Sequence, residues 1–177
     1  GDDIRLFTDE NRKDELASFY TLRQQVTKRD GRPNVALADF VAPEGHRDYV
    51  GGFVVTAGGE EQQIADRFKA AHDDFSAILV QALADRFAEA LAEMMHERAR
   101  RQYWGYSDES FAPDELIAEP YAGIRPAPGY PAQPDHTEKV ALFRLLDATA
   151  ATGVELTESM AMWPGASVSG LYIGHPE

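Results

Sequence analysis

A proline-rich segment, residues 123–136, carries the side chains in this chain that are best suited to bind a ligand. It reads GIRPAPGYPAQPDH and places Arg125, Tyr130, Asp135 and His136 on one short stretch. Proline fixes φ and lacks a backbone donor, so the four prolines exclude an ordinary helix or a central strand. Each proline also favours an extended conformation in the residue before it. The segment is predicted to be a stiff loop that either connects two parts of the fold or forms a binding surface.

Arg125 is the first candidate for ligand binding within this loop. Its guanidinium is permanently charged, and its planar set of donors matches the geometry of a carboxylate. The alternative is an ordinary surface salt bridge. Ala127 and Gly129 would allow a flat ligand to approach the backbone closely. In that case the Tyr130 ring would form one wall of the site. The alternative is that Tyr130 is an aromatic residue of the core or of its rim.

Three acidic residues, Asp85, Glu89 and Glu93, are spaced four apart and share one face of a predicted helix. A solvated acidic face is the ordinary interpretation of this pattern.

Two further kinds of site find little support. Asp135, His136 and His175 could ligate a metal ion, but their spacing matches no known metal motif. Asp135 and His136 suit helix capping before Thr137 equally well. The serines show no nearby base for a nucleophilic triad and are predicted to lie in strands or turns: Ser159, Ser167 and Ser169.

These residues must be positioned by helices and strands, which the hydrophobic pattern of the chain predicts. The pattern indicates an α+β fold, with a mostly antiparallel twisted sheet and long helices packed beside it. A sustained apolar stripe predicts helix from 60 to 101, in one piece or broken near 72–74, and a second helix is expected over 137–152. The expected strands are 4–7 with 16–22 as a hairpin, 35–41, 48–57, and 158–162 paired with 167–173.

The composition limits the class of protein. The chain has 177 residues, of which 44% are hydrophobic, which fits one globular domain. A net charge of -13 disfavours binding to nucleic acid or to an anionic membrane surface. There is no cysteine, which excludes disulfides and thiol chemistry and agrees with a cytoplasmic location.

Longer motifs in the chain resemble the C-terminal activation domain of cobalamin-dependent methionine synthase. The resemblance is carried by GIRPAPGYPAQPDHTEK and LTESMAMWPGASVSGLYIGHP, and upstream by GDDI, LRQQ, LADFVAP, DYVGGFVVTAG, ALADRFAEA and HERARRQYWGY in the family's order. It implies an S-adenosylmethionine-binding module for reductive reactivation, by reductive methylation, of cob(II)alamin. It also implies that a separate domain of the same enzyme holds the cobalamin, and that a flavodoxin-like or flavoprotein donor supplies the electron.

The resemblance assigns roles to individual residues. Arg125 would bind the carboxylate of S-adenosylmethionine, and Ala127, Gly129 and Tyr130 would contact the same ligand. Glu89 matches a carboxylate near the ligand's ammonium or sulfonium charge. The family places three further residues toward the cobalamin: His136, Asp85 and Glu119. The resemblance implies positioning by the protein, with no acid, base or metal ligand.

Residues 1–177 are expected to form one activation domain that is incomplete at both ends. In the family an aspartate that contacts the ligand lies further toward the N-terminus, and a strand with ligand-lining tyrosines follows the HP dipeptide. This chain alone is therefore not expected to complete methionine synthesis. The alternatives are a stand-alone S-adenosylmethionine-binding or scaffold module without catalysis and, less favoured, a metal-dependent hydrolase.

Overall fold

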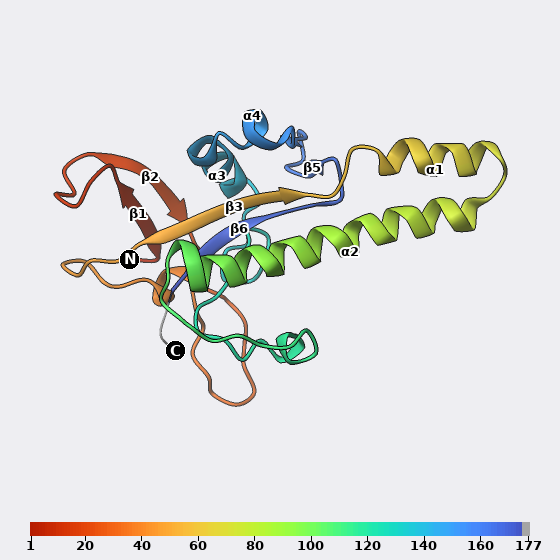
Figure 1. The fold of residues 1–177 in the computed structure, drawn as a ribbon. Coiled ribbons are helices and arrows are strands. Elements are labelled where there is room, and N and C mark those ends of the chain that lie inside the picture. Colours follow the sequence, from red (N-terminus) through yellow and green to blue (C-terminus); the bar gives the residue numbers. More distant parts are fainter. Residues whose placement is uncertain (175–177) are drawn as a thin grey trace.

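A two-stranded antiparallel ribbon forms the centre of the structure, a computed structural model that describes residues 1–174. Strand β3 (Val50–Thr56) pairs with strand β6 (Ser167–Ile173) in unbroken register. These two segments are far apart in the sequence but lie side by side, with helices on both faces (Figure 1). Apart from its two glycines, β3 consists of β-branched and aromatic residues, which favour a buried strand.

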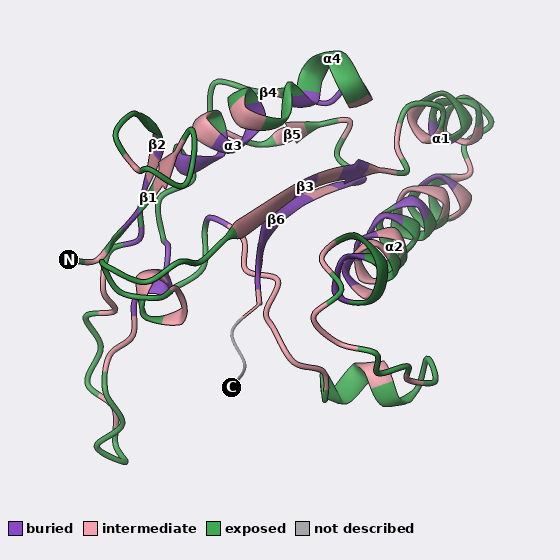
Figure 2. Ribbon diagram, turned by 60° about the vertical axis from the view of Figure 1, so that its left-hand side comes forward, coloured by how far each residue is buried: buried purple, intermediate pink, exposed green. Residues whose placement is uncertain are grey.

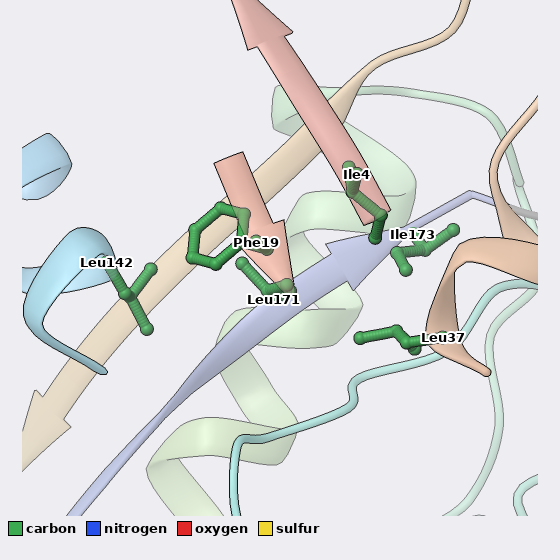
Figure 3. Packing of buried hydrophobic residues seen from close by; sticks show 6 residues of the cluster. All are labelled: Ile4, Phe19, Leu37, Leu142, Leu171 and Ile173. Carbon is green, nitrogen blue, oxygen red and sulfur yellow. The ribbon is translucent and has the colours of Figure 1, made fainter. Parts of the chain in front are cut away.

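One face of the ribbon packs against the N-terminal hairpin and helix α3 (Glu138–Leu146). The hairpin consists of β1 (Asp3–Phe7) and β2 (Glu15–Tyr20), and confirms the expected one. Figure 3 shows the side chains that fill this core, which come from the hairpin, α3, β6 and the short 3-10 helix η1 (Leu37–Phe40): Ile4, Phe19, Leu37, Leu142, Leu171 and Ile173.

Two antiparallel helices, α1 (Glu61–Ala70) and α2 (Asp74–Arg98), form a long hairpin, and α2 packs against the other face of the ribbon (Figure 1). Of the two alternatives for this stretch, one helix or two with a break near 72–74, the structure shows the second. His72 has a left-handed φ of 60°, and the Asp73 side chain accepts a 3.0 Å hydrogen bond from the backbone N–H of Ser76 at the start of α2. Helix α2 continues into a π-helical turn, η2 (Ala99–Tyr103).

The buried side of α2, which packs against α1 and the ribbon, is lined by small residues and appears as a narrow buried stripe in Figure 2. The buried positions are Ala77, Ala84, Ala88, Ala92 and His96. The large apolar residues that predicted the helix are mostly exposed, with Phe75 75% and Phe87 67% exposed. Alanine allows the helix backbone to approach its neighbours closely, so the small residues form the packed face.

Two of the expected elements are corrected by the structure. Residues 35–41 form η1 (Leu37–Phe40) rather than a strand, because the Asp39 side chain accepts a 3.0 Å hydrogen bond from the Ala36 N–H and closes a tight turn. The helix expected over 137–152 is divided into α3 and α4 (Ala148–Thr152) by Asp147, whose φ is 48°.

The pairing expected for the C-terminal strands was also wrong. Strand β4 (Glu155–Leu156) pairs with β5 (Met162–Trp163), and β6 pairs with β3 instead. The α+β class with antiparallel strands is nevertheless confirmed, with the pairing distributed over three two-stranded ribbons. Among residues 1–174, no helix combines the length and hydrophobicity that a membrane span requires.

The proline-rich loop begins as a short addition to the free edge of β6. The Ile124 N–H donates to the Ile173 carbonyl at 2.9 Å, and the Leu171 N–H donates to the Pro126 carbonyl at 2.8 Å. Gly170 makes this approach possible, because a Cβ atom at that position would lie 2.5 Å from the Pro126 carbonyl oxygen. A side chain at 170 would therefore displace the loop that carries Arg125.

We predict that Gly170→Ala destabilises the protein by about 1–3 kcal/mol, because the added methyl group meets rigid backbone. The matched control is Gly165→Ala, since a Cβ atom there has no neighbour within 4 Å. Urea unfolding of both variants measures the difference. Equal stability of the two variants would contradict the close approach of the loop to β6.

Candidate functional site

A pocket of about 290 Å³ opens where the proline-rich loop, β6, β3 and α2 meet. This volume is at the small end of the range for ligand-binding pockets. Phe53 and Val168 provide apolar wall, and Glu89 enters from α2. The remaining lining residues are Leu37, Arg125, Pro126, Ala127, Tyr130, Ala132, Gln133 and Ser169.

Arg125 is held from behind by a carboxylate of α2. Its Nη2 atom donates a 3.0 Å hydrogen bond to Oε2 of Glu93, and its side chain is only 17% exposed. Its Nη1 atom is buried and has no hydrogen-bond partner among the described residues. One side of the guanidinium is thus fixed, while the other retains an unused donor in a residue that lines the pocket.

Glu93 also lies beside a second arginine. Arg100 is fully buried, and its Nη1 atom is 3.8 Å from Oε1 of Glu93. The Arg100 guanidinium carbon lies 3.9 Å from the centre of the Tyr121 ring, in a cation–π contact. The Tyr121 hydroxyl donates to Oε2 of Glu93 at 3.3 Å, and burial raises the pKa of Tyr121 to about 12. Two guanidinium groups therefore share one carboxylate, which leaves a net positive charge beside the pocket.

His96 packs into this cluster as a neutral ring. It stacks on Tyr172 with ring centres 5.3 Å apart, and meets Tyr121 edge-on at 5.0 Å. Burial, and then the charges of Arg100 and Arg125, lower the pKa of His96 to about 3. Protonation of His96 is thus opposed by the same positive charge that favours an anion.

Two further buried polar residues of the pocket have unused hydrogen-bonding groups. Both side-chain amide atoms of Gln133 and the Ser169 hydroxyl have no partner among residues 1–174. Gln133 and Ser169 are 1% and 2% exposed, so bulk solvent does not reach them readily. Buried polar groups are normally paired, so these atoms indicate a polar ligand or ordered water.

The loop turns sharply at Gly129, where the Gly129 N–H donates to the Gln133 carbonyl at 2.8 Å. Gly129 has a φ of 105°, and a Cβ atom there would lie 2.2 Å from Cε1 of His136. The imidazole of His136 therefore packs directly over this glycine. Asp135 accepts a 2.8 Å hydrogen bond from the Thr137 N–H, so the capping role at the start of α3 falls to Asp135 rather than to Thr137.

The structure brings most of the predicted ligand-binding residues together. Arg125, Ala127, Tyr130 and Glu89 line the same pocket, and Gly129 forms the turn beside it.

The residues predicted to face the cobalamin are exposed, and no hydrogen bond or ion pair connects them within residues 1–174. His136 lies over the Gly129 turn, Asp85 lies one helical turn before Glu89, and Glu119 follows η3 (Glu115–Ala118). For the metal alternative, residues 1–174 contain no group of three or more His, Cys, Asp or Glu side chains arranged to hold an ion. His175 lies outside the described residues.

The sequence pattern placed Glu93 on a solvated acidic face, and the largely buried polar stripe that runs from α2 into η2 was missed. Glu93, His96 and Arg100 follow the spacing i, i+3, i+7, which places them on one helix face, and this signal could have been found. Gln133 and Ser169 gave no comparable signal, because their role depends on burial by segments distant in the sequence.

The low pKa of His96 predicts an acid-sensitive fold. Protonation of His96 favours the unfolded chain, because the pKa of this residue is lower in the folded protein. The contribution of neutral His96 to stability is therefore fully present above about pH 6.5, the usual histidine pKa, and is lost as the pH decreases toward 3. Between pH 7 and pH 5, the free energy of unfolding should fall by about 2 kcal/mol more in the wild type than in His96→Phe. Urea unfolding at each pH measures this, with His46→Gln, at an exposed histidine, as the control. Identical pH profiles for wild type and His96→Phe would refute it.

Comparison with known proteins agrees with the resemblance noted in the sequence. The family model for the vitamin B12 dependent methionine synthase activation domain matches residues 1–177. A solved structure, the crystal structure of the MetH reactivation domain bound to AdoHcy, is 56% identical in sequence, with a TM-score of 0.94. The match covers 100% of this chain and 55% of that chain, so this chain spans about half the length of its structural relative. The chain therefore belongs to the family of activation domains of vitamin B12-dependent methionine synthase.

Proposed function

We propose that this chain binds S-adenosylmethionine in the pocket beside Arg125, and that it serves the reductive methylation of cob(II)alamin within a cobalamin-dependent methionine synthase. The structural relative is bound to AdoHcy, which is S-adenosylmethionine without its transferable methyl group. The proposal rests on family membership together with the chemistry of the pocket.

The observation that carries the proposal is the set of unused polar atoms in the pocket. Nη1 of Arg125 is a buried, charged donor without a partner among the described residues. A ligand carboxylate would satisfy it with a charge-assisted hydrogen bond and would neutralise the excess positive charge behind it. Gln133 and Ser169 offer further buried donors and acceptors from the same wall.

A negatively charged side chain lines the same pocket. Glu89 enters the lining from α2, and its carboxylate would favour the sulfonium or ammonium charge of the ligand. S-adenosylmethionine carries one negative and two positive groups, so a pocket with a fixed arginine and an acidic residue matches its charge pattern. Ala127 and the turn at Gly129 leave the loop backbone accessible to the flat adenine, with Tyr130 beside it.

The protein's part in the reaction is mainly positioning. S-adenosylmethionine supplies the methyl group when cobalamin is presented by its own domain, and the pocket fixes the direction of that group. The exposed residues His136, Asp85 and Glu119 would face the cobalamin-binding domain of the same enzyme. A flavodoxin-like or flavoprotein donor would supply the electron in the cytoplasm.

We predict that Arg125→Ala lowers the affinity for S-adenosylmethionine at least tenfold, since a hydrogen bond to a charged group contributes about 1.5–3 kcal/mol. Isothermal titration calorimetry measures this directly. Arg101→Ala is the matched control, because Arg101 pairs with Glu97 on the surface and does not line the pocket.

Three results would count against the proposal. Binding that Arg125→Ala leaves unchanged would place the ligand elsewhere. Absence of binding in folded wild-type protein would remove S-adenosylmethionine as a ligand of this chain. Binding without any gain in cobalamin reactivation, when the cobalamin domain and a reductant are added, would favour the stand-alone binding module.

A further inference from the structure

We propose that Glu93 and Arg100 are positioning residues that hold the Arg125 guanidinium in the orientation required to recognise the ligand's carboxylate. This inference rests on the proposed function, because it assumes that Arg125 binds a carboxylate. It adds that carboxylate recognition depends on residues outside the pocket lining.

The first support is the geometry of the Glu93 carboxylate. Its Oε2 atom is 3.0 Å from Nη2 of Arg125, and its Oε1 atom is 3.8 Å from Nη1 of Arg100. Each oxygen thus faces a different guanidinium. The Arg125 donors are divided in the same way, since Nη2 is used by Glu93 while Nη1 has no partner among the described residues.

The second support is the burial of Arg100. Its side chain is 0% exposed, and none of its guanidinium nitrogens makes a hydrogen bond within residues 1–174. A buried arginine without hydrogen bonds is costly, so a purely structural role explains it poorly. The Arg100 guanidinium attracts the Glu93 carboxylate, and it also makes the cation–π contact with the Tyr121 ring.

The third support is the backbone that places Arg100. The Trp104 N–H donates to the Ala99 carbonyl at 2.9 Å, an i to i+5 bond that defines the π-helical turn η2. Such turns are rare and occur frequently at functional sites. Here the turn follows directly after α2 and carries Arg100 inward, beside Glu93.

Together these contacts favour one orientation of Arg125. Without the Glu93 carboxylate, the two guanidinium groups would repel each other, and Arg125 would lose the hydrogen bond that fixes one edge of its fork. The ligand would still meet the apolar walls and Glu89. The selective loss should therefore be recognition of the carboxylate rather than binding of the rest of the ligand.

The test compares S-adenosylmethionine with decarboxylated S-adenosylmethionine, which lacks only the carboxylate. Calorimetry on the wild type should show a preference of tenfold or more for the carboxylated ligand, as expected for a charge-assisted hydrogen bond. In Glu93→Gln this ratio should fall below about threefold. Glu97→Gln is the matched control, because it breaks the Glu97–Arg101 ion pair one turn further along α2 and should keep the full ratio.

A second variant covers the case in which Glu93→Gln fails to fold. Glu93→Asp keeps the negative charge but withdraws the carboxylate by one methylene group, so a positioning role predicts a reduced ratio at unchanged net charge. A full ratio in a folded Glu93→Gln or Glu93→Asp variant would overturn the inference. Failure of the wild type to bind either ligand would instead refute the proposed function.

Discussion

The contact between the backbone of residues 124–126 and the free edge of β6 is the constraint on which the site depends. The hydrogen bonds at Ile124 and Pro126 place Arg125 beside the ribbon, and Gly170 provides the room for this approach. The prolines that follow prevent the loop from continuing along the strand, because they lack backbone donors. The loop therefore leaves β6 near Ser169, and the pocket opens at that point.

The same ribbon determines how α2 contributes. Around Ala92, helix α2 packs against β3 and β6, and this places Glu89 in the pocket lining and Glu93 behind Arg125. The protein carries a net charge of -13, yet the cluster around Glu93 holds two arginines for one carboxylate. Burial makes this local imbalance effective, since charges interact more strongly away from bulk water. A neutral His96 is compatible with the imbalance, whereas a charged one would add to it.

Much of the site could be predicted because its signals are local. Arg125, Ala127 and Tyr130 share one proline-rich loop, and Glu89 follows from helical spacing and the family resemblance. The break before Asp73 and the N-terminal hairpin were also visible in short stretches.

Non-local features could not be predicted in the same way. A hydrophobic stripe identifies a helix but does not decide which face packs, and in α2 the small residues were buried while Phe75 and Phe87 remained exposed. The pairing of β6 with β3 joins segments more than a hundred residues apart, so the pattern within 158–173 suggested the wrong partner. Ser169 and Gln133 became candidates only once their burial was known.

The most direct test of this account is a crystal structure of the chain with S-adenosylmethionine or S-adenosylhomocysteine bound. The ligand carboxylate is expected within hydrogen-bond distance of Nη1 of Arg125, while Nη2 of Arg125 remains bonded to Glu93. The sulfur atom of the ligand is expected on the side of the pocket that Glu89 lines. A ligand bound away from the proline-rich loop, or with its carboxylate turned away from Arg125, would contradict it.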